Sequence, residues 1–430
     1  MKKVFFILAL MSLCLATGAA WAGQDIDISG VIADNVLGNG TPPDGTAPAV
    51  WPDNAEGNSV TINNGGSVAG VVFGGAGIVS VTNNSVTVNS GGSVSSVVAG
   101  GFASHPTDKA TALGNRVNIS GGSVGMDVIG GLAQSVGEAE TKGNSVTISG
   151  GSVGVMVIGG AAMSDADAAA VDNSITMSGG NALEDIYGGY AGSGAGDVKV
   201  TGSIVSMSGG SAKNVGGGRG ISNTGDVTIT GSKVSISGGT INGNAGGGYI
   251  ECPAGTATGT GNTLTISGNP VFHATSGLYG SNIDVGTGDE FTGNRLELKT
   301  AIVVQLVCNF EFMDFYLPSG ISDGDVMLAL TDSTSLTDVK VDLKFNTSPP
   351  NLAVGDVITL IDWVLMTGSF SDKTVTVSGY TFEISRTSGK LVAEVTAAPG
   401  KKGGGGGCNG FTYGLVMLAL FVPFVLRGKC

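Results

Sequence analysis

The sequence predicts an all-β protein, a parallel β-helix (β-solenoid) with coils of about 29 residues followed by a small β cap domain. A phrase of short strand, Gly-Gly pair, second short strand and second Gly-Gly pair recurs along the chain. The strands alternate apolar and polar residues, and no amphipathic helical pattern separates them. A β-propeller, the main alternative, needs about 40 residues per blade. The first Gly-Gly pairs start 26 to 30 residues apart, at Gly65, Gly91, Gly121, Gly150, Gly179, Gly209 and Gly238.

Residues 1–22 have the pattern of a signal peptide. Lys2 and Lys3 precede an apolar run over residues 4–15. Small residues occupy the two positions that a signal peptidase reads, Ala20 and Ala22, so we expect cleavage before Gly23. The sequence therefore predicts an exported protein.

Residues 23–56 form an N-terminal lead-in and cap segment. The stretch TPPDGTAPAVWP, over 41–52, contains too much proline for a central strand. An uncovered solenoid end would offer unpaired strand edges to other chains. We therefore expect this segment to cover the first coil.

Residues 57–300 carry the β-helix repeats. In NSVTISGG, Val146 and Ile148 flank Thr147, which is the period of a strand with one buried face. We expect the aliphatic pairs to stack coil on coil and the intervening polar residue to face outward. The inward pairs are Val60/Ile62, Val86/Val88, Val117/Ile119, Val146/Ile148, Ile175/Met177, Val205/Met207, Val234/Ile236 and Leu264/Ile266.

A row of asparagines lies two residues before the first inward aliphatic of each unit. Parity places these residues on the buried side at the strand entrance, where one amide can bond its counterpart in the next coil. The alternative is that they only mark turns. Serine takes the position at Ser203 and Ser232. The sequence thus predicts a structural ladder of Asn58, Asn84, Asn115, Asn144 and Asn173.

Each unit continues with a branched residue two positions before the second Gly-Gly pair, such as Val128 or Val157. Glycine at both corners allows sharp turns without a Cβ clash. The remaining residues vary in length and polarity, which indicates loops or a poorly patterned third strand. At about 4.8 Å per coil, eight to nine coils predict a rod of roughly 40 Å.

Residues 301–396 are predicted to form a C-terminal β cap region. The run VITLIDWVLM, over 357–366, suits a strand buried on both faces. Phe310, Phe312, Phe315 and Tyr316 make a dense aromatic cluster. We favour a cap that closes the rod, and an aromatic carbohydrate-binding surface is the alternative.

The chain closes with a glycine-rich linker over 397–407 and a tail over 408–430 that combines a cysteine, an apolar stretch and basic residues. As a helix the apolar stretch, 411–426, would reach about 24 Å, against about 30 Å for a bilayer core. Arg427 and Lys429 follow it and fit retention on the cytoplasmic side.

The sequence GGGGGCNG, which includes Gly406, Gly407 and Cys408, closely resembles the Synergist-CTERM protein-sorting domain. This resemblance covers about the last 30 residues. It implies cleavage near Cys408 by a membrane-embedded sorting protease and attachment to the cell envelope, through a lipid on that cysteine. A plain membrane anchor is the alternative. Both place the body of the protein at the cell surface.

The repeats and the region after them, from about residue 57 to 360, resemble the passenger regions of bacterial autotransporters and related adhesin-like proteins. The segment FMDFYLPSGISDGDVMLAL, over 312–330, resembles the region that closes such a helix. The resemblance implies a glycine-rich right-handed β-helix. Because no C-terminal run of amphipathic strands is long enough for an outer-membrane barrel, we expect the sorting tail to replace one.

The composition fits an extracellular scaffold. The chain holds 76 glycines, with 20 basic against 34 acidic residues. Without the four basic residues of the two end segments, the formal charge is −18. Such a surface repels nucleic acid, so we expect no nucleic-acid partner. Neutral, cationic or cation-bridged partners remain, such as host-cell, matrix or glycan ligands.

Two cysteines, Cys252 and Cys308, lie in the body of the chain, 56 residues apart. An oxidising exterior would allow a disulfide between them. That spacing is close to two coils, or about 9.6 Å, which exceeds the limit of about 7 Å for the Cα atoms of a bridge. The sequence leaves their pairing open.

Residues with catalytic or metal-binding chemistry are sparse. His105 and His273 lie in separate, poorly patterned stretches, so they complete neither a metal cluster nor a serine triad. Asp165, Asp167 and Asp172 lie close in sequence but lack the glycine-bearing loop of an EF-hand. We predict no catalytic residue, no metal and no cofactor.

The best candidates for acid–base chemistry are Asp127 and Asp185. Both lie three residues before a second Gly-Gly pair, in units two coils apart. Stacking would separate them by about 9.6 Å, within the range of inverting glycosidases. The sequence favours an exported, envelope-anchored structural or adhesin-like β-solenoid without catalytic activity. A surface polysaccharide lyase or glycoside hydrolase is the alternative.

Overall fold

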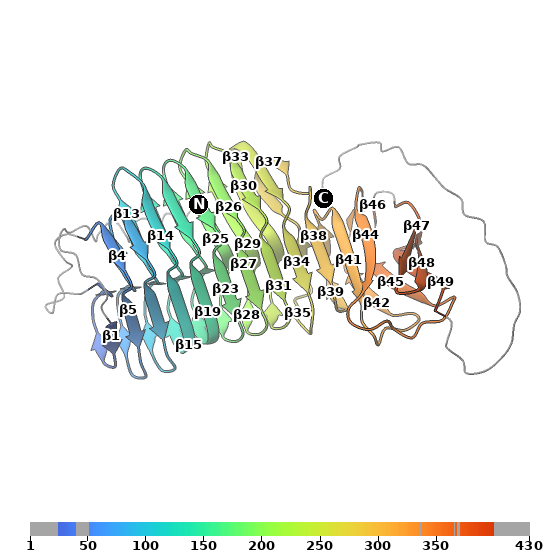
Figure 1. Ribbon diagram of the computed structural model, residues 1–430, viewed down its shortest axis with the longest axis horizontal. Coiled ribbons are helices and arrows are strands. Elements are labelled where there is room, and N and C mark those ends of the chain that lie inside the picture. Colours follow the sequence, from blue (N-terminus) through green and yellow to red (C-terminus); the bar gives the residue numbers. More distant parts are fainter. Residues whose placement is uncertain are drawn as a thin grey trace, which may run out of the picture.

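The computed structural model describes residues 25–39, 51–332, 334–335, 337–364, 366–367 and 370–399. Every helix or strand assigned within these ranges is a strand, and the two largest sheets are parallel throughout. The predicted all-β parallel β-solenoid is therefore confirmed. Figure 1 shows an elongated body in which successive coils lie side by side.

The first large sheet, here called the base sheet, contains one main ladder of twelve parallel strands in the described ranges. Neighbours pair in register, as in Val117 with Val146 and Val146 with Ile175. Eleven steps of about 4.8 Å give a ladder about 53 Å long. Its strands are β1 (Asp25–Ile28), β5 (Ser59–Ile62), β10 (Ser85–Val88), β15 (Arg116–Val124), β19 (Ser145–Val153), β23 (Ser174–Met177), β27 (Ile204–Met207), β31 (Lys233–Ile236), β34 (Thr263–Ile266), β38 (Arg295–Leu298), β41 (Phe312–Leu317) and β44 (Lys340–Phe345).

Beyond the first Gly-Gly corner of each unit, short strands extend the base sheet. The chain then turns and enters the second large sheet. The short base-sheet strands are β2 (Val31–Ile32), β6 (Ser67–Val68), β11 (Ser93–Val94), β24 (Asn181–Ala182), β28 (Ser211–Ala212), β32 (Thr240–Ile241) and β35 (Val271–Phe272). The strands opposite them, here called elbow strands, are β3 (Val36–Leu37), β7 (Val72–Phe73), β12 (Val98–Ala99), β16 (Val128–Ile129), β20 (Val157–Ile158), β25 (Ile186–Ser193), β29 (Val215–Ser222), β33 (Ala245–Thr260), β36 (Gly277–Tyr279) and β40 (Leu306–Cys308).

The rest of each unit forms two further regular strands, where loops or a poorly patterned third strand were expected. We call this part the arm. Its first layer is β8 (Ala76–Gly77), β13 (Phe102–His105), β17 (Leu132–Ser135) and β21 (Ala161–Ser164), continued within β25, β29 and β33. Its second layer is β4 (Asn54–Glu56), β9 (Ser80–Thr82), β14 (Ala110–Leu113), β18 (Ala139–Lys142), β22 (Ala168–Val171), β26 (Val198–Thr201) and β30 (Val227–Thr230), continued within β33. Strand β37 (Asn282–Asp289) runs through both layers, like β33.

Two separate cores fill the coils that carry an arm. The main core lies between the base sheet and the elbow strands and contains every predicted inward pair. The arm core is narrow and consists mostly of alanine, for example Ala133, Ala162 and Ala170. Small side chains let the two layers of the arm approach closely, which is why this region shows little hydrophobic signal in the sequence.

The five ladder asparagines lie at the waist between base sheet and arm, and all are buried. The amide Nδ2 of Asn144 donates to Ala112 O at 2.8 Å, and its Oδ1 accepts the backbone N–H of Asn115 at 2.9 Å. Both amide hydrogens and the carbonyl oxygen of Asn144 are thus satisfied. Each amide also donates to the Oδ1 atom of the next ladder residue: Asn58 to Asn84 at 2.8 Å, Asn84 to Asn115 at 3.1 Å, Asn115 to Asn144 at 3.0 Å and Asn144 to Asn173 at 3.0 Å.

This ladder requires the second Gly-Gly pair of each unit. A Cβ atom on Gly131 would lie 2.2 Å from Oδ1 of Asn144, and one on Gly160 would lie 2.3 Å from Oδ1 of Asn173. Neither glycine has a positive φ angle. Close approach of the elbow to the asparagine, and not backbone conformation, therefore excludes a side chain here.

Serines interrupt the ladder in two coils. The Oγ atoms of Ser203 and Ser232 are buried without a hydrogen-bond partner among the described residues. The arm residue three positions earlier is alanine in the coil of Asn173, but it is Val200 and Ile229 in the serine coils. Larger arm side chains therefore occupy the volume that the shorter serines leave.

The parallel ladder is longer than the range 57–300 over which the repeat phrase was expected to extend. Strands β1, β2 and β3 pair with the first repeat, so part of the segment 23–56 builds a coil of its own. At the other end, β41 pairs with β38 and β44 with β41. The glycine phrase ends earlier than the stacking because the last coils lack the arm.

A smaller sheet closes the main core at the C-terminal end. Its parallel part is β39 (Ile302–Val304), β42 (Val326–Leu330) and β45 (Val357–Asp362), and its antiparallel part is β49 (Lys390–Ala397), β48 (Tyr380–Thr387) and β47 (Lys373–Val377). The strands β43 (Thr334–Ser335) and β46 (Met366–Thr367) form a separate pair. Strand β45 has four consecutive buried residues, as expected of a strand covered on both faces.

Cys252 and Cys308 do not form a disulfide, because Cys252 is a free buried thiol. Its Sγ lies 3.3 Å from Gly225 O. In the preceding coil Ser222 occupies the same arm turn and its Oγ donates to Gly196 O at 2.9 Å. Cys252 therefore replaces a serine in a row of turn-capping side chains.

Candidate functional site

The two carboxylates that the sequence offers for catalysis, Asp127 and Asp185, lie at the corner before the elbow strands. Asp127 is 1% exposed, and its Oδ1 accepts the backbone N–H of Met156 from the next coil at 2.9 Å. Burial raises the pKa of the Asp127 carboxyl. Met156 lies between the two aspartates in the stack, so they do not face a common space.

Both carboxylate oxygens of Asp185 also accept hydrogen bonds from neighbouring side chains. Its Oδ1 accepts from Asn214 Nδ2 at 2.7 Å, and its Oδ2 accepts from the Tyr187 hydroxyl at 3.1 Å. The row continues with Asn214, whose Oδ1 accepts the backbone N–H of Asn244 at 2.7 Å. Asp127 and Asp185 thus belong to a row of side chains that accept hydrogen bonds from backbone or side-chain groups of the next coil.

The other polar residues singled out in the sequence also stabilise turns. His105 Nδ1 accepts the backbone N–H of Asp108 at 2.7 Å, and His273 Nδ1 lies 2.9 Å from Thr275 Oγ1. Asp167 accepts the backbone N–H of Asp197 at 2.9 Å. Across the described residues, no group of three or more His, Cys, Asp or Glu side chains is arranged to hold a metal ion.

The predicted aromatic cluster divides between core and surface. Phe310 and Phe315 are 1% exposed and belong to the main core. Phe312 lies between Arg295 and Lys340, 4.5 and 4.9 Å from its ring centroid. Because cations cover this ring, it does not offer a free stacking face to a sugar.

The neighbouring ring, Tyr316, has Lys299 at 4.7 Å and Lys344 at 5.1 Å from its centroid. The buried carboxylate of Asp314 bridges Arg295 and Lys344 at 2.5 Å each. On the outer face of β41, the basic side chains are thus paired with the Asp314 carboxylate and with the two aromatic rings. The carbohydrate-binding surface considered for these rings therefore gains no support here.

The concave side of the elbow, here called the notch, was not foreseen from the sequence. It contains the residues that directly flank the second Gly-Gly pair, for example Ile129 and Leu132. Near β3 and β12 it is filled by Trp51, Phe73 and Phe102, with ring centroids 5.3 Å apart for Trp51 and Phe102. This end of the notch is a packed apolar stripe.

Farther along, the notch becomes aromatic and charged. Arg219 on β29 donates from Nη2 to Glu251 Oε1 on β33 at 2.5 Å, and both side chains are less than one quarter exposed. The Tyr187 and Tyr249 rings meet edge to face with centroids 5.8 Å apart. A Cβ atom on Gly216 would lie within 3 Å of both rings, so glycine at this position makes room for them.

Two buried hydroxyls in this cluster have no hydrogen-bond partner among the described residues, those of Tyr190 and Tyr249. Burial raises the pKa of Tyr190 to about 12 and that of Tyr249 well above its ordinary value. Both remain neutral at physiological pH. An unpaired buried hydroxyl costs about 1 to 3 kcal/mol. This end of the notch therefore leaves buried polar groups without hydrogen bonds to described residues, whereas the amides of the asparagine ladder are all hydrogen-bonded.

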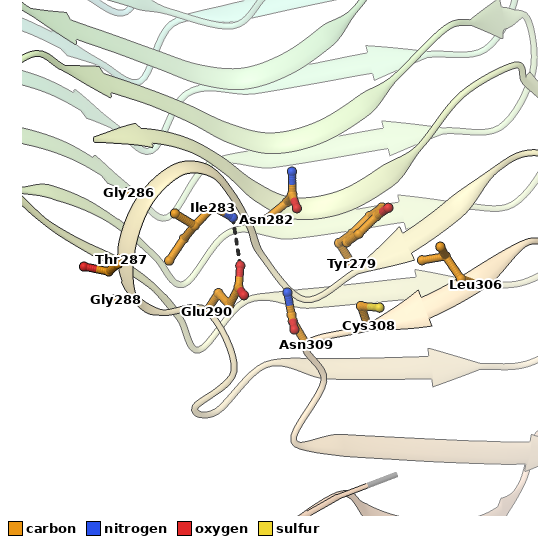
Figure 2. Close-up of a pocket in the computed structure, with 10 residues that line it drawn as sticks. All are labelled: Tyr279, Asn282, Ile283, Gly286, Thr287, Gly288, Glu290, Leu306, Cys308 and Asn309. Carbon is orange, nitrogen blue, oxygen red and sulfur yellow. Dashed lines mark hydrogen bonds between the residues drawn. The ribbon is translucent and has the colours of Figure 1, made fainter. Parts of the chain in front are cut away.

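The notch leads to a pocket at the point where the arm ends. After β37 the next coil contributes only β40 to this sheet, which leaves a recess of about 320 Å³ beside the last arm strand. Figure 2 shows Ile283, Thr287 and Glu290 on one side and Tyr279 and Cys308 on the other. The complete lining is Tyr279, Asn282, Ile283, Gly286, Thr287, Gly288, Glu290, Leu306, Cys308 and Asn309.

Some polar groups of this pocket already form hydrogen bonds within the described part of the protein, and others do not. Glu290 Oε2 accepts the backbone N–H of Ile283 at 2.8 Å, which blocks one edge group of β37. Asn309 Nδ2 donates to Ser281 O at 2.9 Å. The side chains of Asn282 and Thr287 make no hydrogen bond to another described residue.

The predicted terminal sites lie outside the described residues. These are the signal-cleavage residues Ala20, Ala22 and Gly23 and the sorting residues Gly406, Gly407 and Cys408. Over the ranges that are described, no helix is long and apolar enough to cross a membrane. Comparison of the chain with protein-family models, curated proteins and solved structures gives no match.

Proposed function

We propose that this chain is an exported, cell-envelope-anchored structural or adhesin-like rod without catalytic activity. The observation that carries the proposal is the continuous in-register ladder of the base sheet, from β1 to β44. A body about 53 Å long, built from stacked identical contacts, suits a protein that spans distance or presents a surface. This architecture alone fits structural and adhesive roles, and its location is argued from the sequence.

The positions of the candidate carboxylates support a non-catalytic role. A general acid or base needs its proton-bearing atom within reach of a bound substrate. Asp127 is buried and holds the next coil through Met156 N–H, and Asp185 holds Asn214 and Tyr187. Both aspartates thus have a structural task that accounts for their presence.

Export and anchoring are part of the proposal and rest on the two ends of the sequence. The signal-peptide pattern ends at Ala22, and the resemblance of the tail to a sorting domain centres on Cys408. In this proposal a sorting protease cuts the tail near Cys408, and a lipid or the apolar segment holds the body on the membrane. Host-cell, matrix or glycan ligands would then meet the exposed rod.

The test is surface labelling of cells that make the full chain, with Cys408→Ala and the matched variant Cys430→Ala. We expect protease-accessible protein on wild-type and Cys430→Ala cells, and released or mislocalised protein from Cys408→Ala cells. Protein that stays in the cytoplasm would contradict the proposal. Unchanged retention and mass of the Cys408→Ala protein would favour the plain membrane anchor over the sorting tail.

A second arm addresses the enzyme alternative. The full chain is incubated with a panel of polysaccharides, and reducing ends and unsaturated products are measured. We expect no turnover. If a polysaccharide is degraded and Asp127→Asn or Asp185→Asn abolishes the activity, the rod is an enzyme and the non-catalytic proposal is wrong.

A further inference from the structure

The pocket at the end of the arm has a lining of mixed polarity. It combines one aromatic ring, three uncharged polar side chains, one carboxylate and an apolar wall formed by Ile283, Leu306 and Cys308. None of the ten lining residues is Lys, Arg or His. The formal charge of the whole chain is −14. An anionic ligand would therefore find no counter-charge at this site.

A metal ion is also a poor match for the pocket. Glu290 is its single carboxylate, and one of its oxygens already accepts the N–H of Ile283. Hard cations such as Ca²⁺ take about six to eight oxygen ligands. The polar groups instead suit a ligand that carries many hydroxyls, because Asn amides donate and accept, threonine does both, and a carboxylate accepts.

The size and position of the pocket narrow the class of possible ligands further. Its volume of about 320 Å³ lies at the lower end of the range of about 300 to 1,000 Å³ for small-molecule sites. The Tyr279 ring is half-buried and forms part of the wall (Figure 2), and aromatic faces pack against apolar ligand surfaces. The recess opens at the end of the arm, so a chain held there can continue into solvent.

We propose that this pocket binds one sugar unit of a neutral glycan. Asn282 and Thr287 would bond the sugar hydroxyls, Glu290 would accept from a further hydroxyl through its second oxygen, and Tyr279 would pack against the ring. The inference deepens the proposed function, since it names the ligand class of an adhesin-like rod. It differs from the surface at Phe312 and Tyr316, whose rings are covered by cations.

The test is titration calorimetry of the purified full chain with maltohexaose, cellohexaose, xylohexaose and chitohexaose, and with oligogalacturonate as the anionic comparison. We expect at least one neutral hexasaccharide to bind at millimolar concentration or below and oligogalacturonate to bind more weakly. Loss of one ligand hydrogen bond should weaken binding about fivefold. Asn282→Ala and Thr287→Val each remove one such bond.

The matched control is Asn269→Ala, an exposed asparagine between β34 and β35 that does not line the pocket. Unchanged affinity of this variant, with weakened binding by Asn282→Ala or Thr287→Val, supports the site. Thr287 is exposed, so its substitution tests the site even if Asn282→Ala fails to fold. The inference is overturned if no neutral hexasaccharide binds, if oligogalacturonate binds most tightly, or if the pocket variants bind like wild type. Surface labelling tests the proposed location separately, so a failure of the glycan proposal can be told apart from a failure of the proposed function.

Discussion

Replacing one ladder asparagine tests the interaction that joins base sheet and arm. In Asn144→Ala, the backbone N–H of Asn115 loses its only acceptor in the ladder, and Ala112 O loses the amide that donates to it. The Nδ2 group of Asn115 keeps a bond to Val81 O at 3.1 Å. The buried N–H of Asn115 is thus left unpaired, whereas Ala112 O remains within the ladder of β14 and β18, so we expect a loss of about 1 to 3 kcal/mol in unfolding free energy.

The assay combines urea unfolding of the full chain with hydrogen exchange of the peptide that contains residue 115. Exchange is needed because a stacked-repeat protein can open locally without unfolding as one unit. The matched control is Asn118→Ala, an exposed asparagine of the outward row on β15, which should change stability by no more than about 0.5 kcal/mol. If Asn144→Ala costs no more than Asn118→Ala and exchange at Asn115 is unchanged, the ladder does not stabilise the waist.

Three further substitutions probe the elbow, the notch and the corner. Gly131→Ala places a Cβ atom 2.2 Å from Oδ1 of Asn144, so we expect a loss of more than about 2 kcal/mol in urea unfolding. A cost below about 1 kcal/mol would contradict the close approach. Tyr190→Phe removes a buried hydroxyl without a described partner, so its melting temperature should equal or exceed that of wild type, and a marked decrease would reveal a partner. Asp127→Asn keeps an acceptor for Met156 N–H and removes a carboxyl whose pKa is raised by burial. Because the folded pKa lies above the unfolded value of 3.8, wild type loses stability as pH rises above 3.8. Asp127→Asn should therefore be at least as stable as wild type at pH 7 and should lose any advantage over it below pH 3.8. The opposite trend would contradict a raised pKa at Asp127.

The repeat period made the main core predictable. The inward pairs follow a strict two-residue alternation, and a fixed offset joins each pair to an asparagine. A buried amide that recurs at one position of successive coils can bond its equivalents above and below, so sequence spacing was enough to predict contacts such as Asn115 with Asn144.

The arm was harder to foresee because its core is built from small side chains. Strands β18 and β22 bury Ala139, Ala168 and Ala170, and alanine has no strong preference for a strand. The variable turns between arm strands also blur the repeat. The stacking itself supplies the regularity that the residue pattern does not display, since arm strands such as β17 and β18 pair in register with their equivalents in the next coil.

The functional reading of single residues depends on partners that a sequence does not reveal. Asp127 looked like a member of a carboxylate pair, but its partner is the backbone N–H of Met156. The pocket draws residues from β36, β37, β40 and the turns between them. Its signal in the sequence is the end of the glycine phrase after Gly247, where the arm stops and a recess begins.

Coil-on-coil register is tested most directly by cross-linking outward residues of adjacent coils. Thr147 pairs with Thr176, and Thr176 with Ser206, so these three positions stack along the base sheet. Adjacent Cα atoms lie about 4.8 Å apart, within disulfide range, whereas two coils separate them by about 9.6 Å, beyond the limit of about 7 Å. After oxidation and peptide mapping, the double variant Thr147→Cys with Thr176→Cys should show the bridge, and Thr147→Cys with Ser206→Cys should not. A bridge in the second variant, or none in the first, would contradict the in-register solenoid.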